Sequence, residues 1–131
     1  MSRPHSPLRK ITLHLARTKD HPEGSSAHGY ILVAPLTDEG RIDAAQWRNN
    51  PAACGVTRFW GEQELRHGRL THRPGGARGA TWTFDYDANT LADDEAGFRF
   101  GDHRLAPGEY LSVRSPDGDL RTFRVAKVEA F

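Results

Sequence analysis

Residues 110–131 read YLSVRSPDGDLRTFRVAKVEAF, and this stretch contains two alternating segments joined by a turn. YLSVR (110–114) alternates apolar and polar residues, SPDGD (115–119) has Asp-Gly at its centre, and LRTFRVAKVEAF (120–131) is a long strand pattern. An Asp-Gly pair between two such segments indicates a β-hairpin. The apolar set changes phase between Val125 and Val128, which predicts a bulge. The run from Phe98 to Val128 therefore looks like the closing part of a small barrel.

Further strand patterns lie upstream of this hairpin. They are ITLHLA (11–16), GYILVAPL (29–36), VTRFW (56–60), RLTHR (69–73), TWTFDY (81–86) and FRF (98–100). TWTFDY places Trp82, Phe84 and Tyr86 on one face, and GEQELRHG (61–68) reads as a polar connection. Short strands with turn residues every 8 to 12 positions are typical of all-β domains. The sequence predicts a mainly β fold: a small antiparallel barrel or sandwich of seven to eight short strands with one short helix.

The helix is expected after residue 42, where the sequence reads DAAQWRNNP. Asp43 is a good N-cap, Gln46 has the spacing of a capping-box partner, and Pro51 ends the helix. We expect this helix to cap one end of the β structure. Residues 1–9 contain two prolines and no pattern, so they are interpreted as a disordered tail, and residues 10–131 as a single β-rich domain.

Composition excludes several classes of protein. Eighteen basic residues nearly balance seventeen acidic ones, so the net charge of +1 gives no electrostatic reason to bind nucleic acid or a membrane. The single Cys54 excludes a disulfide framework and a cysteine-rich zinc site. The N-terminus has no apolar leader segment, and the longest apolar run is too short for a bilayer. We expect a soluble cytoplasmic protein, and the excess of arginine over lysine indicates a GC-rich bacterial genome.

Motifs for metal or nucleophilic chemistry are incomplete. DYDANTLADDE (85–95) matches the first positions of a calcium loop, but Thr90 replaces the glycine and Ala96 stands where the bidentate acid belongs. His67 and His72 would lie on opposite faces of one strand. Cys54 follows alanines without a neighbouring base and reads as a small buried residue. No metal and no cofactor are predicted, although histidines from separate strands, such as His14, His28 and His103, could converge.

Arginines interleaved with aromatic residues form the first candidate site. Arg58 and Trp60 share one face of VTRFW, and Arg99, Tyr110 and Arg114 take outward positions on the C-terminal strands. Such a face could dock a protein partner, because Trp, Tyr and Arg are preferred interface residues. It could also stack the bases of a single-stranded nucleic acid, but the near-zero net charge disfavours that. The alternative is that Trp60 belongs to the core and the arginines are solvated.

The chain also resembles a family of short bacterial proteins. The segments that carry the resemblance are HGYILVAPLTDEGRIDAAQW (28–47), RFWGEQEL (58–65) and DEAGFRFGDHRLAPGEYLSVR (94–114). The shared pattern covers roughly residues 10 to 128 and implies no activity, ligand or partner. It does direct attention to HGY (28–30) and GDH (101–103).

Two functions are therefore open. The first is a non-catalytic binding module that uses the Arg/aromatic face, with a protein as the preferred partner. The second is a small-ligand or metal-dependent site around His28, Tyr30, Asp102 and His103, in which Asp102 orients an imidazole by a hydrogen bond. A pocket that holds two or more of those four side chains would favour the second function. The sequence leaves the ligand, catalysis and the oligomeric state open.

Overall fold

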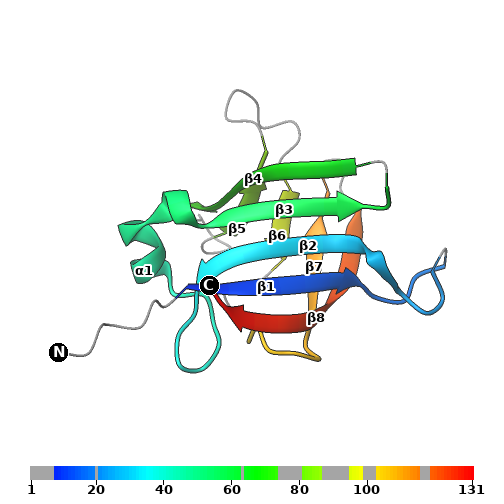
Figure 1. Ribbon diagram of the computed structural model, residues 1–131, viewed down its shortest axis with the longest axis horizontal. Coiled ribbons are helices and arrows are strands. Elements are labelled where there is room, and N and C mark those ends of the chain that lie inside the picture. Colours follow the sequence, from blue (N-terminus) through cyan, green and yellow to red (C-terminus); the bar gives the residue numbers. More distant parts are fainter. Residues whose placement is uncertain are drawn as a thin grey trace.

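The strand patterns form one closed antiparallel barrel in the computed structural model (Figure 1). The structure describes residues 8–19, 21–62, 64–73, 81–86, 95–98, 103–115 and 119–131. Its strands are β1 (Leu8–Leu15), β2 (Ser25–Pro35), β3 (Gly55–Trp60), β4 (Glu64–Arg73), β5 (Thr81–Asp85), β6 (Glu95–Phe98), β7 (Tyr110–Arg114) and β8 (Leu120–Ala130). Each strand pairs with the next one in sequence, and β8 pairs with β1. The predicted mainly β fold is confirmed.

Alternation along the strands places one side-chain set inside the barrel. The buried residues form one cluster that includes Ile11, Leu13, Tyr30, Leu32, Val56, Leu70, Trp82, Phe84, Leu111, Val113, Phe123 and Val125. Trp82 and Phe84 are buried and Tyr86 packs against them, as the sequence predicts. An eight-stranded barrel is just wide enough for side chains to fill its interior, and this core does so.

The predicted bulge in the last strand is present. Thr12 of β1 pairs with Lys127, but Leu13 pairs with Val125, so Ala126 has no partner in β1. The extra residue keeps both Val125 and Val128 on the core side, which explains the change of phase in the sequence.

Several strand boundaries differ from the prediction. β1 starts at Leu8 rather than after residue 9, because the long β2 continues to Pro35 and offers Leu8 a partner. β4 starts at Glu64, inside the segment interpreted as a polar connection, because residues 64–68 continue the antiparallel pairing with β3. β6 spans Glu95–Phe98 and so begins before the predicted 98–100, because Gly97 pairs with both Trp82 and Val113; residues 99–100 lie outside the described part of the chain.

One short helix, α1 (Ala44–Asn49), is followed by a 3-10 turn, Pro51–Ala53. The Asp43 side chain accepts hydrogen bonds from the Ala45 and Gln46 backbone N–H groups, so the predicted N-cap is confirmed. The expected capping box is not formed, because the Asp43 backbone N–H donates to the Pro35 carbonyl instead. None of the helices among the described residues is both long and apolar enough to cross a bilayer.

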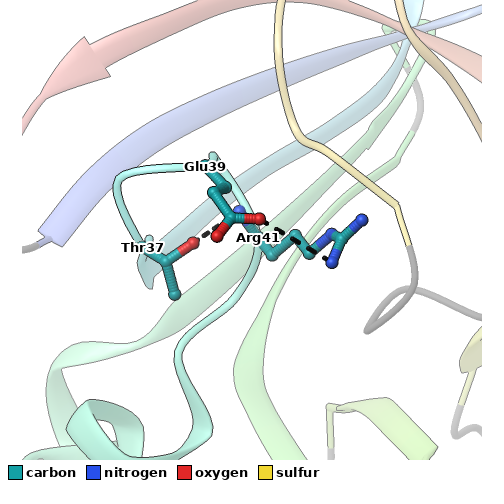
Figure 2. A network of polar contacts seen from close by, with 3 residues as sticks. All are labelled: Thr37, Glu39 and Arg41. Carbon is teal, nitrogen blue, oxygen red and sulfur yellow. Dashed lines mark hydrogen bonds and ion pairs between the residues drawn. The ribbon is translucent and has the colours of Figure 1, made fainter.

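The connection between β2 and α1 folds into a tight turn of its own. The Thr37 hydroxyl accepts a hydrogen bond from the Arg41 backbone N–H, and the Arg41 guanidinium lies 3.9 Å from a Glu39 carboxylate oxygen (Figure 2). Gly40, with φ of 86°, accepts a hydrogen bond from the Leu105 N–H. The segment before β7 is thereby fixed at the same end of the barrel as α1.

Up-and-down connectivity gives the barrel two distinct ends. The helix end contains α1, residues 103–109, the beginning of β1 and the end of β8 (Figure 1). The opposite end, called the mouth here, contains the described parts of the β1–β2 connection, the β3–β4 turn at Gly61 and the start of β8.

Candidate binding sites at the mouth and on the outer wall

An irregularity in β2 positions His28 at the mouth. His14 pairs with Gly29 and Leu15 pairs with Ser25, so residues 26–28 have no partner in β1. His28 still pairs with Trp60 of β3, and Gly61 donates its N–H to the Ala27 carbonyl. A bulge of this kind redirects a side chain, here the imidazole of His28.

The His28 ring is held from two sides. Its Nδ1 lies 2.7 Å from the Ser25 hydroxyl oxygen. Its ring centroid lies 4.8 Å from that of Trp60, edge to face, and 4.8 Å from that of His21. Burial, followed by the charges of His21 and Arg58, lowers the pKa of His28. The ring is therefore neutral at pH 7.

Two arginines from different strands meet at Trp60. The guanidinium carbon of Arg58 lies 4.4 Å from the Trp60 ring centroid, and that of Arg121 lies 5.4 Å from it. Both distances are within the range of cation–π attraction, about 6 Å. The indole therefore gathers two positive charges at the mouth.

Aromatic rings close the interior just below this group. The Tyr30 ring centroid lies 5.1 Å from that of Phe84 and 5.0 Å from that of Phe123, and all three residues are buried. Trp60 lies on this layer, with its centroid 6.3 Å from Phe123. A ligand at the mouth would therefore rest on aromatic rings rather than enter the barrel.

A second candidate site lies on the outer wall. Tyr110 pairs with Arg124, and Arg124 pairs with His14, so three outward side chains from β7, β8 and β1 form one transverse row. An open groove of about 890 Å³ runs beside this row. It is lined by His14, Leu15, Ala16, Arg17, Glu23, Gly24, Ser25, Ser26, Tyr110, Thr122 and Arg124.

The groove carries more positive than negative charge. Arg17 and Arg124 are exposed and form no ion pair with a described residue, and Glu23 is the single acid among the described lining residues. Burial, then Arg124 and Lys127, lowers the pKa of His14. The Tyr110 ring is 57% exposed. The groove thus combines cations, a neutral imidazole and an accessible aromatic surface.

The structure does not bring the predicted His28 and His103 together. His28 lies at the mouth, whereas His103 precedes Leu105, which bonds to Gly40 beyond the far end of β2. From His28 to Pro35 the extended strand measures about 23 Å at ~3.3 Å per residue. Two ligands of one metal ion lie much closer than this, because each bond is about 2 Å. The prediction of a site shared by His28 and His103 is therefore wrong. Tyr30 is a core residue beneath the mouth.

The predicted Arg/aromatic residues occupy two surfaces rather than one. Arg58 and Trp60 do share a face, but that face points into the mouth. Tyr110 and Arg114 point away from the core on the outside of β7. Arg99, Asp102 and most of the possible calcium loop, residues 87–94, lie outside the described residues.

Other side chains of the protein could bind a metal ion or act as nucleophiles. In the described part of the chain, no three His, Cys, Asp or Glu side chains gather closely enough to hold a metal ion. His67 and His72 lie on opposite faces of β4, as predicted: His67 bonds to Thr57 on the outside, and His72 stacks on Trp82. Cys54 is fully buried, as predicted, and burial raises the pKa of its thiol.

Sequence reasoning missed Arg121 and Arg124, and it considered His14 only as a possible metal ligand. Arg121 has the same parity in β8 as the core residues Phe123 and Val125, which indicated an inward arginine near the strand end. The row of His14, Arg124 and Tyr110 depends on the register between three strands, which no local pattern shows.

Comparison with known proteins identifies no relative of this chain. The chain matches no family model, no curated protein and no solved structure.

Proposed function

We propose that the protein is a non-catalytic binding module whose outer-wall groove takes an acidic segment of a protein partner. The observation that carries the proposal is the row of Tyr110, Arg124 and His14 along the rim of an open groove. Tyrosine and arginine are enriched among the residues that dominate protein interfaces.

The charges of the groove indicate the chemistry of the partner. Arg17 and Arg124 are available to pair with carboxylates, and His14, whose pKa is lowered by burial, adds a neutral hydrogen-bonding group to the lining. Arginine forms bidentate hydrogen bonds with carboxylates, which adds direction to the electrostatic attraction. Exposed charges of this kind mainly select the partner and speed association.

The size of the groove fits a short peptide segment. Its volume of about 890 Å³ is near the upper end of the usual range for ligand clefts, about 300–1,000 Å³. Nucleic acid is the weaker alternative, because its binding rests on many phosphate contacts. The whole chain has a net charge of only +1, which gives little attraction to a phosphate backbone.

The proposal is tested by titrating the protein with a short peptide of alternating glutamate and leucine, followed by two-dimensional NMR. We expect shifts at the amides of residues 14–17, 110 and 122–124. Arg124→Glu should weaken binding about tenfold or more, the effect of losing ~1.4 kcal/mol. Arg48→Glu, on α1 at the helix end, is the matched control and should bind as the wild type does.

Two results would contradict the proposal. One is the absence of shifts at the groove with the glutamate peptide. The other is tighter binding of an oligothymidylate, or of the same peptide with lysine in place of glutamate, at these residues.

A further inference from the structure

A line of outward positions continues from the groove across the wall of the barrel. Along this line each residue pairs with the next one on the neighbouring strand, through β7, β8, β1, β2, β3 and β4 in turn. The line, called the transverse strip here, consists of Tyr110, Arg124, His14, Gly29, Phe59 and Leu65. We infer that the acidic segment of the partner also carries an apolar side chain, which docks on Phe59 and Leu65; this inference rests on the proposed function of the groove.

The two apolar residues of the strip point away from the core. Trp60 packs against the core, so the preceding Phe59 faces outward by the alternation of the strand. The Phe59 ring accordingly meets the ring of His14 on the outside of β1. Leu65 pairs directly with Phe59 and is 65% exposed. Phe59 and Leu65 therefore form an apolar surface outside the barrel.

Phe59 joins this apolar surface to the groove across β2. Gly29 has no side chain, and a Cβ built on it would collide with the Leu13 carbonyl oxygen. The same Cβ would stand 3.1 Å from Cζ of Phe59, so the ring lies over the glycine. The Phe59 ring centroid lies 6.3 Å from that of His14, edge to face. Because His14 also lines the groove, a bound segment can run from the groove to Leu65 along one continuous surface.

The apolar surface is wider than one exposed side chain. Ile31, two residues along β2 from Gly29, also faces outward and is partly exposed. Phe59 is partly exposed as well. Ile31, Phe59 and Leu65 thus present apolar side chains on three adjacent strands. Apolar side chains scattered singly are ordinary surface, whereas a contiguous group beside a polar groove is typical of an interaction site.

The charges along the strip fix which end of the segment lies where. None of the positions of the strip, all of which the structure describes, holds an acidic residue. The exposed Arg124 lies at the groove end, whereas Glu62 is exposed in the turn before β4. Glu64 and Arg66 flank Leu65 in β4, at positions of the other face of the strand. Carboxylates of the partner are therefore attracted to the groove end, and its apolar side chain faces Leu65.

The strand spacing gives the distance between the acid and the apolar side chain. Phe59 stands three strands from Arg124 and Leu65 stands four strands from it, which is about 14 and 19 Å at ~4.8 Å per strand. An extended segment covers ~3.4 Å per residue, so about four to six residues separate the two groups. Side chains an even number of residues apart lie on one face of such a segment, so spacings of about four and six place both on the barrel.

The test compares three peptides of one length, each with two glutamates separated by one residue in a background of serine. The first peptide has a leucine four residues beyond the second glutamate. The second has serine there, and the third carries the leucine between the two glutamates. Each peptide is also made with the reversed sequence. Affinity is measured by calorimetry, and the contacted residues are identified by two-dimensional NMR.

The first peptide should bind about fivefold more tightly than the second, the gain from burying much of a leucine side chain. All three peptides should shift the amides of the groove, but only the first should also shift those of Phe59 and Leu65. In Leu65→Ser, the first peptide should bind only as tightly as the second. Phe131→Ser, at an apolar residue that is 63% exposed at the helix end, is the matched control and should keep the whole gain.

The possible failures separate the two proposals. If the second peptide binds in the groove and the first binds no more tightly, the inference is overturned and the proposed function stands. If no peptide shifts the groove amides, both are overturned. Equal affinity of the first and third peptides, or the full gain in Leu65→Ser, also overturns the inference, because the leucine would then act elsewhere than on the strip.

Discussion

Each end of the barrel holds a tryptophan in contact with a histidine, but the two pairs have different surroundings. At the helix end, the Trp82 and His72 ring centroids lie 4.2 Å apart, and Trp47 of α1 packs against both rings. At the mouth, the Trp60 and His28 ring centroids lie 4.8 Å apart, and two guanidinium groups lie over the indole. One tryptophan is covered by another aromatic ring and the other by cations.

The difference bears on stability. Trp82 is only 3% exposed, and the Trp47 indole N–H donates to the Leu70 carbonyl at 2.9 Å. The mouth holds guanidinium groups instead, and charged groups near a protein surface contribute little to the stability of the fold. We therefore expect changes at the helix end to lower stability more than changes at the mouth.

The largest effect is expected for Trp82→Ala. Truncation of a buried large aromatic side chain costs about 3–5 kcal/mol, because it removes apolar contacts and leaves a cavity. Chemical denaturation should show this loss in the free energy of unfolding. Leu65→Ala, at a residue that is 65% exposed, is the control and should change little. A loss below about 1 kcal/mol for Trp82→Ala would mean that the helix end does not hold the barrel together.

Trp47→Phe should have a smaller effect at the same end. Phenylalanine keeps part of the packing on Trp82 but cannot donate to the Leu70 carbonyl. Loss of one such hydrogen bond costs about 1–2 kcal/mol. Thermal unfolding of this variant beside Trp82→Ala would show how much of the stability comes from the cap, and an unchanged midpoint would show that α1 contributes nothing.

At the mouth, Trp60→Phe should lower stability less than Trp82→Ala does. The smaller ring still packs on Phe123, so chemical denaturation should show a loss of less than about 1 kcal/mol in the free energy of unfolding. Phenylalanine attracts cations less strongly than tryptophan, so part of this small loss should come from the weaker contact with Arg58 and Arg121. A loss as large as that of Trp82→Ala would mean that the two ends do not differ in this way.

Much of this architecture is contained in local sequence patterns. Alternation in TWTFDY gave the buried face of β5, the asparagine–proline pair gave the end of α1, and the phase change before Val128 gave the bulge. β4 was partly missed, because the positions of residues 64–68 that share a face with the buried Leu70 are Glu64, Arg66 and Gly68. Without apolar side chains at those positions, no alternation is visible.

The sites depended on long-range geometry that the sequence did not reveal. Arg58 and Trp60 were found together because they stand two residues apart on one strand. His28 and His103 were paired wrongly, because nothing local shows that their segments leave the barrel at opposite ends. In an up-and-down barrel, alternate connections lie at the same end, so the predicted strands between the two residues would have separated them if this connectivity had been assumed.

The smallest effect concerns the two histidines, and it tests the comparison without any substitution. Burial is the main cause that lowers the pKa of both rings, followed by Arg48 for His72 and by His21 and then Arg58 for His28. The folded state therefore binds fewer protons than the unfolded state, in which histidine has a pKa of about 6.5. Their contribution to stability is complete above that pH and is lost as the pH falls through the lower folded pKa values. The loss should be modest, because both rings are partly open to water. Titration of the imidazole Cε1 protons by NMR measures both pKa values. A pKa at or above about 6.5 for either histidine would contradict the effect of burial on that ring.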